Sequence, residues 1–313
     1  MSITKPWKLI FKALSNPNYN INENYKLHRK IITASRPYFK PFYNMIDRKV
    51  KTDNGDVAIR IFKPKVKLNN NPLDIIMFFH GGGWVTGNVD NYTSICGNMA
   101  NQINCVVVSV EYRLAPEYPF PEGLEDCYNV TKRIAASIME ANKKSKKRRL
   151  ILAGDSAGGN LAAVISLLAR KTSDFTPDIQ MLFYPSCYND YSENSPFESV
   201  RLYGEDYVLT SKRIREYMEL YVEDEKDLNS PLVAPLLAKD LSKQPDTLII
   251  TAEFDPLRDE AEEYGLRLKE AGNSVVVYRM EDALHGFLSL PKGSRIKEVF
   301  YDKINEFLED KGD

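Results

Sequence analysis

The sequence predicts a mainly parallel α/β sheet that helices cover on both faces. Six short apolar runs are spaced along the chain, and segments of helical length separate most of them. Continuous apolar strands that alternate with helices are typical of a parallel sheet, because helices bury both of its faces. The expected strands are 75–79, 105–110, 150–153, 179–183, 247–251 and 275–278.

An antiparallel edge is expected ahead of these strands, at residues 50–63. Asn54 and Gly55 form a dipeptide that is typical of a two-residue hairpin turn. Apolar residues then alternate with others from Val57 to Ile61, as in a strand with one buried face. This part of the chain therefore predicts a hairpin at the edge of the sheet.

Two segments do not fit the sheet and predict a cap over one of its ends. Residues 1–45 and 186–230 are rich in aromatic side chains, and 211–222 has the spacing of a helix. The second segment lies between two predicted strands, so we interpret it as an insertion. No linker or repeat divides the chain, and we expect residues 1–313 to form a single domain with this cap.

Composition and charge narrow the classes of function. Of the 313 residues 43% are hydrophobic, and 42 basic and 43 acidic side chains give a net charge of −1. Most nucleic-acid-binding proteins carry an excess of positive charge, so no nucleic-acid partner is expected. No apolar stretch reaches the ~18 residues of a membrane span, and no signal peptide is visible. We therefore expect a cytoplasmic protein without stable membrane insertion.

The four cysteines predict buried thiols. Cys96, Cys105, Cys127 and Cys187 form no C-x-x-C pair and have no zinc-like spacing, so no metal site is expected. A reducing compartment favours free thiols. The spacing alone leaves a disulfide open.

A serine on a sharp turn is the first candidate for catalysis. Gly154 and Gly158 flank Ser156 in the pattern G-x-S-x-G, directly after the apolar run 150–153. The pattern matches a nucleophile elbow, a strand-to-helix turn that exposes the serine hydroxyl. Side chains at the two glycines would collide with the adjoining strand or helix. The alternative is a glycine-rich turn with an incidental serine, and other residues decide between the two.

A second glycine-rich loop, His80-Gly81-Gly82-Gly83, follows the first central strand. Consecutive glycines let backbone N–H groups approach a ligand closely, and such donors stabilise the oxyanion of an acyl-transfer reaction. Gly82, Gly83 and Ala157 are the expected donors, with His80 and Gly81 supporting the loop. Seven of the 16 glycines lie in this loop, just after it or at the elbow, which argues against two unrelated turns.

The candidate serine needs a base, because a hydroxyl is a weak nucleophile near neutral pH. The chain has only three histidines. His28 lies in the N-terminal segment with no strand end nearby, and His80 belongs to the glycine loop. His285 follows the last predicted strand, at the end of the sheet where catalytic groups gather in open α/β folds. Elimination leaves His285 as the expected general base.

The base in turn needs an acid that fixes its tautomer and stabilises the imidazolium. Asp255 lies just after a predicted strand, and a proline behind it fixes a turn. Asp259 and Glu260 are expected to begin the next helix, where acids favour the helix dipole. Asp282 is too close to His285 in sequence to be the first choice. Asp255 is therefore the expected acid.

Five motifs together resemble the hormone-sensitive-lipase group of α/β-hydrolase esterases. They are His-Gly-Gly-Gly-Trp at 80–84, Tyr-Arg-Leu-Ala-Pro-Glu at 112–117, Gly-Asp-Ser-Ala-Gly-Gly at 154–159, Asp-Pro-Leu-Arg-Asp-Glu at 255–260 and His-Gly-Phe at 285–287. The triad order Ser156, Asp255, His285 also matches that of α/β-hydrolases. The resemblance implies an eight-stranded core, a helical cap and ester hydrolysis without a cofactor.

The expected function is that of a serine carboxylesterase, which hydrolyses short- to medium-chain esters through an acyl-enzyme on Ser156. An amidase or peptidase on the same triad is the first alternative, since the motifs do not separate ester from amide bonds. A small-molecule receptor on the same scaffold is the second, and the presence of all three triad residues argues against it. The expected partner is a small ester, and a homodimer through an exposed strand edge or the aromatic cap is left open.

Overall fold

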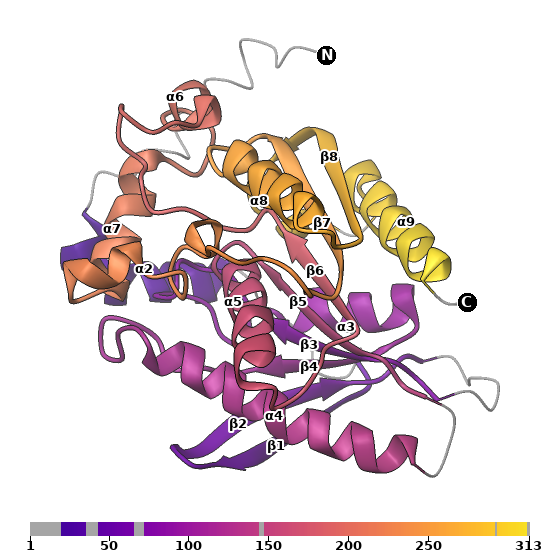
Figure 1. Cartoon of the computed structure of the whole chain (residues 1–313). Helices are drawn as coiled ribbons and strands as arrows, with labels where there is room; N and C mark the ends of the chain where they lie inside the picture. The colour runs from indigo at the N-terminus through magenta and orange to yellow at the C-terminus, as the bar shows by residue number, and fades with distance from the viewer. Residues whose placement is uncertain (1–19, 36–42, 66–71, 144–146, 292, 312–313) are drawn as a thin grey trace.

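The sheet has eight strands in the order β1-β2-β4-β3-β5-β6-β7-β8 in the computed structural model of the chain (Figure 1). The structure describes residues 20–35, 43–65, 72–143, 147–291 and 293–311. β2 is antiparallel to β1 and β4, and every other described pair is parallel. The strands are β1 (Met45–Thr52), β2 (Gly55–Phe62), β3 (Ile75–Phe79), β4 (Val106–Val110), β5 (Leu150–Asp155), β6 (Ile179–Phe183), β7 (Asp246–Phe254) and β8 (Val275–Leu284). The predicted eight-stranded, mainly parallel sheet with its antiparallel edge is confirmed.

The last two strands run further than the apolar pattern predicts. β7 ends at Phe254, and β8 ends at Leu284, directly before His285. β8 forms the outer edge of the sheet, and its second half carries exposed polar residues such as Arg279 and Glu281. An edge strand needs no continuous apolar run, so its hydrophobic pattern stops before its hydrogen bonding does.

A layer of helices packs on each face of the sheet (Figure 1). One face carries α4 (Glu122–Asn142), α5 (Ala157–Thr172) and α8 (Arg258–Glu270), and the other carries α3 (Thr93–Ile103) and α9 (Arg295–Asp310). Successive side chains of β3 alternate between the two layers. Met77 and Phe79 join the core beneath α5, and Ile76 and Phe78 join the core beneath α3 and α9. All four are fully buried, which explains why the central strands are apolar throughout.

Three further helices lie together at one end of the molecule, outside these layers (Figure 1). They are α2 (Ile21–Ser35), α6 (Glu198–Tyr203) and α7 (Ser211–Tyr221), and α7 confirms the helix predicted in the insertion. α2 and α7 are in direct contact. The backbone N–H of Ile21 donates to Glu216 Oε2 (3.3 Å), and the side-chain amide of Asn22 donates to Glu219 Oε2 (2.6 Å).

The remaining described elements are short. The 3-10 helices are η2 (Glu225–Asn229), η3 (Pro235–Leu237) and η4 (Phe287–Ser289). Residues 1–19 and 36–42 lie outside the described ranges, so α2 is the described helix of the N-terminal segment that was predicted to contribute to the cap.

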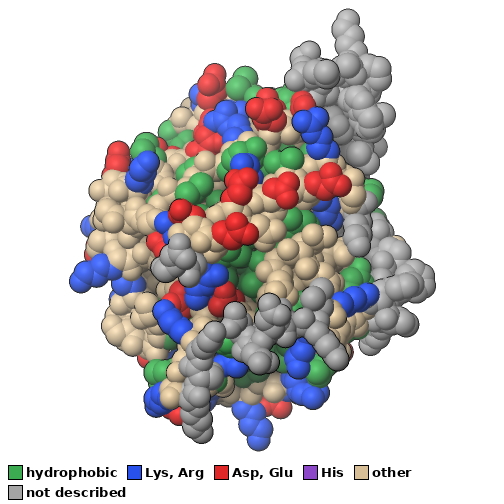
Figure 2. Space-filling view, turned by 90° about the vertical axis from the view of Figure 1, so that its right-hand side faces the viewer, with side chains coloured by type: hydrophobic (Ala, Val, Ile, Leu, Met, Phe, Trp, Pro, Cys, Tyr) green, Lys and Arg blue, Asp and Glu red, His purple; other side chains and the backbone are tan. Residues whose placement is uncertain are grey.

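The distribution of surface charge and the burial of the cysteines agree with the expectations from the sequence. Acidic and basic side chains are interspersed over the face shown in Figure 2. Within the described ranges, no helix has the length and apolarity that a membrane span requires. Cys96, Cys105, Cys127 and Cys187 are all buried and free, so the prediction of buried thiols is confirmed.

Candidate active site

Ser156 lies on the turn between β5 and α5, with φ of 54° and ψ of −119°. Few residues with a side chain adopt a positive φ, so the turn is strained. A Cβ atom on Gly154 would collide with the carbonyl group of Gly158, and one on Gly158 would collide with the carbonyl oxygen of Phe79. Both positions therefore require glycine, and Ser156 is held at the border of a cavity.

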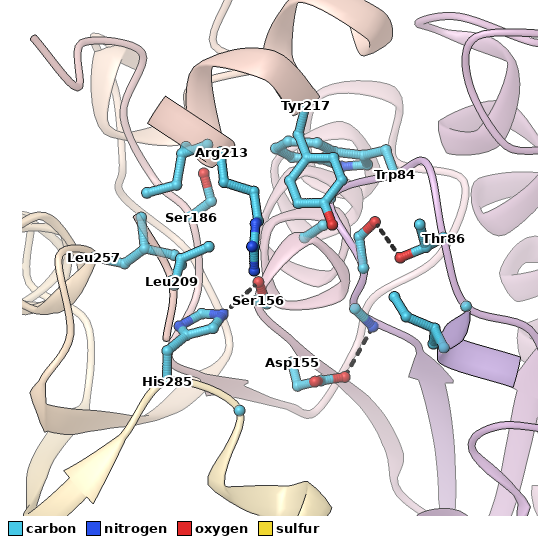
Figure 3. A pocket seen from close by; sticks show the side chains of 18 of the residues that line it. Trp84, Thr86, Asp155, Ser156, Ser186, Leu209, Arg213, Tyr217, Leu257 and His285 are labelled. Atoms are coloured by element: carbon cyan, nitrogen blue, oxygen red, sulfur yellow. Dashed lines mark hydrogen bonds between the residues drawn. The ribbon is translucent and has the colours of Figure 1, made fainter. Parts of the chain in front are cut away.

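The structure brings the three predicted triad residues into one chain of hydrogen bonds. Figure 3 shows the part of it that joins His285 to Ser156. His285 Nε2 lies 2.9 Å from Ser156 Oγ, and His285 Nδ1 lies 2.7 Å from Asp255 Oδ2. The Asp255 side chain is fully buried, and its other oxygen accepts the N–H of Leu257 at 2.9 Å. A proton on Nδ1 faces the carboxylate, which leaves Nε2 as the acceptor for the serine hydroxyl.

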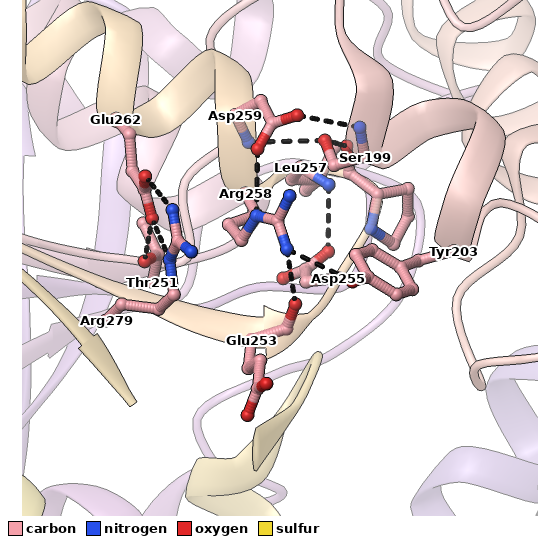
Figure 4. Close-up of polar contacts among 11 residues, drawn as sticks. Ser199, Tyr203, Thr251, Glu253, Asp255, Leu257, Arg258, Asp259, Glu262 and Arg279 are labelled. Atoms are coloured by element: carbon pink, nitrogen blue, oxygen red, sulfur yellow. Dashed lines mark hydrogen bonds and ion pairs between the residues drawn. The ribbon is translucent and has the colours of Figure 1, made fainter. Parts of the chain in front are cut away.

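The loop that carries Asp255 is fixed by a polar network (Figure 4). Asp259, in the first turn of α8, accepts the backbone N–H of Ser199 at 2.7 Å. Arg258 donates to Asp259 (2.8 Å), to the carbonyl oxygen of Glu253 (3.0 Å) and to the hydroxyl of Tyr203 (3.3 Å). These bonds tie the start of α6, in the inserted segment, to the end of β7.

The predicted oxyanion donors border the same cavity. Gly82, Gly83 and Ala157 line it, and the two glycines have φ angles of 120° and 61°. Among the hydrogen bonds of the described residues, none uses the backbone N–H of these three residues. Three N–H groups beside the serine can thus stabilise a negatively charged oxygen.

Side chains behind the glycine loop hold it in place. The N–H of Gly81 donates to Asp155 Oδ1 (2.9 Å) and to the Tyr92 hydroxyl (3.1 Å). His80 is fully buried, its Nδ1 lies 3.0 Å from the Gly81 carbonyl oxygen, and its ring stacks on Tyr112 at 4.2 Å. Sequence reasoning placed His80 and Gly81 here, and Tyr112 opens the motif at 112–117. It missed the part that Asp155 and Tyr92 play: Asp155 lies within the serine motif, whereas no motif pointed to Tyr92.

The cavity has a volume of about 490 Å³ and is lined by two structurally different walls. The wall that we call the floor comes from strand ends, and the wall that we call the roof comes from α2, α7 and the segment before α7. Floor residues include Gly82, Gly83, Ser156, Ala157 and His285, and roof residues include His28, Ile32, Leu209, Arg213, Ile214 and Tyr217. A ligand in this cavity would therefore contact both the expected catalytic groups and the helices above them.

His28 lies in the cavity roof, contrary to the expectation that it is remote from the strand ends. Its Nε2 lies 2.8 Å from the hydroxyl of Tyr217, which joins α2 to α7. Burial, together with the positive charge of Arg213, lowers the pKa of His28 from 6.5 to about 4, so His28 is neutral near pH 7. The hydroxyl of Ser156 is hydrogen-bonded to His285 instead. His28 reaches the cavity because it lies on the face of α2 that packs over it, and no spacing in the sequence predicted this position.

The cysteines offer no competing nucleophile in the described part of the chain. Burial raises the pKa of the Cys105 thiol to about 12, and burial also raises the pKa values of the other three thiols. A thiol that stays protonated is a poor nucleophile. Within the described ranges, no three His, Cys, Asp or Glu residues are grouped as a metal site requires.

Comparison with known proteins places this geometry in a family. Residues 76–289 match a family described as having the alpha/beta hydrolase fold. An arylesterase of Saccharolobus solfataricus is 38% identical over 250 residues, which cover 80% of this chain and 78% of the relative. A carboxylic ester hydrolase of Mycobacterium tuberculosis, LipN, is 32% identical over 276 residues, with coverage of 85% and 70%.

Solved structures agree with these sequence relatives. The hyperthermophilic esterase from Pyrobaculum calidifontis superposes with a TM-score of 0.78 at 31% identity, and the match covers 98% of this chain and 99% of that one. A thermostable esterase from Pseudomonas putida superposes with a TM-score of 0.84 at 25% identity, covering 97% and 96%. The chain therefore belongs to the α/β-hydrolase fold family, within its hormone-sensitive-lipase-like group of esterases.

Proposed function

We propose that the chain is a serine carboxylesterase that hydrolyses short- to medium-chain esters. Hydrolysis of carboxylic esters is the activity that the family relatives support. The observation that carries the mechanism is the alignment of Ser156, His285 and Asp255 at 2.9 Å and 2.7 Å beside the cavity. Its volume of about 490 Å³ lies in the range of small-molecule sites, which suits an acyl chain of modest length.

In the acylation half, Ser156 Oγ attacks the ester carbonyl carbon while His285 Nε2 takes the hydroxyl proton. The buried carboxylate of Asp255 stabilises the resulting imidazolium. The carbonyl oxygen becomes an oxyanion that the N–H groups of Gly82, Gly83 and Ala157 stabilise. The bond to the alcohol oxygen then breaks, and His285 returns the proton to the departing alkoxide.

In the deacylation half, water replaces the alcohol. His285 Nε2 removes a proton from water as the water oxygen attacks the acyl carbon. The second tetrahedral intermediate uses the same N–H donors. The bond between Ser156 Oγ and the acyl carbon breaks, and the proton on His285 returns to the serine. The net reaction consumes one water and yields one acid and one alcohol.

We further infer that α2 and the inserted segment form a cap on a single domain. Direct bonds between α2 and α7 support this, as do the roof residues that both helices contribute. A cap of this kind excludes water from the acyl-enzyme and limits the length of the acyl chain. The cytoplasmic location and the homodimer remain predictions from the sequence.

The test is the Ser156→Ala variant. We expect a loss of at least about 10⁴-fold in kcat for p-nitrophenyl butyrate, because the nucleophile is removed while the fold is kept. A fluorophosphonate probe should label the wild-type chain at Ser156 and leave the variant unlabelled. Near-normal turnover by the folded variant would exclude the serine mechanism, and a folded wild-type chain that neither reacts nor turns over would favour a receptor.

An acyl series from acetate to palmitate tests the chain-length claim. We expect kcat/KM to fall sharply beyond medium chains, because the cavity is of limited size. Matched butyryl ester and anilide substrates separate esterase from amidase, since an amine is the poorer leaving group. Equal rates on ester and anilide would contradict the assignment.

A further inference from the structure

The end of β6 lies between the strands that carry the catalytic triad. Ser156 follows β5, Asp255 follows β7 and His285 follows β8. β6 lies between β5 and β7 in the sheet and ends at Phe183 (Figure 1). The next residue is Tyr184, which is fully buried. Because the ends of parallel strands meet at one edge of a sheet, Tyr184 lies among the triad residues.

The backbone of Tyr184 has a conformation that is unusual for a large side chain. Its φ is 37°, in a region where a bulky residue is strained. The N–H of Tyr184 donates to the carbonyl oxygen of Ile250 in β7 at 2.7 Å, and the N–H of Ser156 donates to the carbonyl oxygen of Phe183 at 2.9 Å. Strained conformations persist only where the surrounding structure holds them, and they cluster at functional sites. The conformation therefore indicates a functional role for the side chain that it directs.

The ring of Tyr184 packs on the imidazole of the expected base. The ring centroids of Tyr184 and His285 are 4.9 Å apart and the ring planes meet at 62°, which is a T-shaped contact. The tyrosine ring also meets Phe287 at 4.9 Å and 74°, so it is packed against the residues that follow the base. Packing of this kind restricts rotation of the imidazole, whose orientation places Nε2 2.9 Å from Ser156 Oγ.

The hydroxyl of Tyr184 reaches the carboxylate that holds the glycine loop. It donates to Asp155 Oδ2 at 3.4 Å, and the Tyr92 hydroxyl donates to the same oxygen at 3.0 Å. Asp155 Oδ1 accepts the N–H of Gly81, which directly precedes the two glycines expected to supply oxyanion donors. Tyr184 therefore contacts the base through its ring and the support of the oxyanion loop through its hydroxyl.

We propose that Tyr184 is a positioning residue for ester hydrolysis, which holds His285 in line with Ser156 and, through Asp155, helps to hold the oxyanion loop. It acts through these residues and not on the substrate, because it is not among the described residues that line the cavity. The ring has the larger part, since a hydrogen bond of 3.4 Å is weak. The inference rests on the proposed esterase function and adds a residue on which the chemical step depends.

The ring and the hydroxyl can be removed separately. Tyr184→Phe removes the hydroxyl and keeps the ring, and Tyr184→Leu removes both. We expect kcat for p-nitrophenyl butyrate to fall by about two- to fivefold in the first variant and by about 10²-fold in the second, with KM within about threefold of wild type in both. Tyr184→Met, whose flexible side chain fills irregular space, takes the place of Tyr184→Leu if that variant does not fold.

A comparison of two leaving groups tests whether the loss arises at the base. His285 must protonate a departing ethoxide, whereas p-nitrophenolate departs without a proton. In Tyr184→Leu we expect kcat/KM for ethyl butyrate to fall about tenfold further than kcat/KM for p-nitrophenyl butyrate. Tyr184→Phe should keep the wild-type ratio of the two substrates, because its ring still packs on the imidazole. General destabilisation would lower activity on both esters in the same proportion.

Tyr301→Leu is the matched control for the loss of the ring. Tyr301 is a buried tyrosine of the same hydrophobic core as Tyr184, and its ring packs on Phe300 within α9. This variant should lower the stability of the protein. In the folded protein, kcat and the ratio of the two substrates should stay within about twofold of wild type.

The double variant Tyr92→Phe/Tyr184→Phe tests the link to the oxyanion loop. It removes the hydroxyls of both tyrosines from Asp155 Oδ2, whereas each single variant leaves one of them. We expect the loss of kcat in the double variant to exceed the product of the two single losses, because the carboxylate loses both donors only there. A loss equal to that product would overturn the role of the Tyr184 hydroxyl.

The remaining outcomes are distinct. A folded Tyr184→Leu enzyme with wild-type kcat on both esters overturns the inference and leaves the esterase intact. A loss that is equal for the two leaving groups, or that Tyr301→Leu reproduces, also overturns it. Failure of the proposed function itself would appear as no turnover of either ester by the wild-type enzyme.

Discussion

The cavity floor consists of loops at the ends of strands, whereas the roof consists of the faces of two helices and the segment before α7. In the floor, the backbone conformation restricts which residue types fit. Ser156 needs a positive φ, and the turn around it has no room for a Cβ at Gly154 or Gly158. In the roof, His28, Arg213 and other side chains project from ordinary helices into the space above the serine. The floor therefore constrains residue identity far more tightly than the roof does.

The difference between floor and roof suggests that the floor determines the chemical step and the roof determines which substrate binds. A change in the floor alters the groups that touch the reacting atoms, so it should act mainly on kcat. Changes in the roof alter what binds above them, and those should act mainly on KM and on preference among substrates. Contacts between the walls include the packing of Tyr217 over Gly83 and the stacking of the Trp84 and Tyr221 rings at 4.4 Å.

Apart from Ser156→Ala, the largest effect is expected at Asp255, the buried acid behind His285. In Asp255→Asn, the amide can donate to His285 Nδ1 and so move the imidazole proton to Nε2, where it blocks proton transfer from Ser156. We expect kcat for p-nitrophenyl butyrate to fall by about 10⁴-fold. The asparagine oxygen can still accept the N–H of Leu257, so the circular dichroism spectrum should be unchanged.

Asp282→Asn is the control for that loss. Asp282 is the acid nearest to His285 in sequence, and its φ of 57° is one that asparagine tolerates. Its backbone N–H donates to Glu253 at 2.7 Å, and the substitution preserves that bond. Activity within a few fold of wild type is expected. A loss as large as that of Asp255→Asn would move the role of the acid to Asp282.

The next effect is expected where floor and roof touch. In Gly83→Ala, the added methyl group would collide with the Tyr217 ring, so the glycine loop must shift and move the N–H of Gly83. Displacing one oxyanion donor should lower kcat by roughly 10²- to 10³-fold. Stopped-flow or steady-state rates with p-nitrophenyl acetate measure this loss.

A second glycine provides a control that distinguishes backbone strain from the collision with Tyr217. Gly272 also has a positive φ, of 87°, and a Cβ there would meet nothing within 4 Å. Gly272→Ala should therefore cost about 1 kcal/mol of stability and leave kcat unchanged. If both alanine variants lost activity equally, the loss would reflect general destabilisation and not the oxyanion loop.

The same contrast explains what the sequence could predict. The floor was predictable because each strand end places the next residues at one edge of a parallel sheet, so Ser156, Asp255 and His285 could be assigned by order along the chain. The ends of β7 and β8 could not be predicted in this way. In β8, exposed polar residues continue the hydrogen bonding beyond the apolar run. His28 and Arg213 escaped prediction because a helix exposes several faces, and only packing shows which one meets the cavity.

A third effect concerns Glu260, whose hydrogen bonds join α8 to the start of the inserted segment. Glu260 is fully buried, and one of its oxygens accepts the N–H groups of Cys187 and Tyr188 and the hydroxyl of Tyr191. Burial raises the pKa of Glu260 from 4.5 to about 8. The protonated Glu260 carboxyl group adds to the free energy of unfolding, and this contribution is fully present below pH 4.5. It is lost as the pH rises toward 8, because the unfolded chain releases this proton at a lower pH than the folded chain does.

We therefore expect the free energy of unfolding to fall by about 2–3 kcal/mol from pH 5 to pH 7 through this one group. Urea unfolding at a series of pH values measures the slope. Glu260→Gln cannot ionise, so the slope over this range should be smaller by that amount. An identical slope in the variant would show that Glu260 is already ionised in the folded chain.

The smallest effect is expected in the roof, at the bond between Tyr217 and His28. Tyr217→Phe removes the hydroxyl that lies 2.8 Å from His28 Nε2 and keeps the ring that packs on Gly83. One hydrogen bond between α2 and α7 contributes about 1 kcal/mol, so kcat/KM should fall by only a few fold, mainly through KM. The bonds of Ser156 with His285 are untouched, because the Tyr217 hydroxyl is not part of that chain. A loss of more than about 100-fold in kcat would place this part of the roof in the chemistry itself, and the division between a catalytic floor and a selective roof would fail at that point.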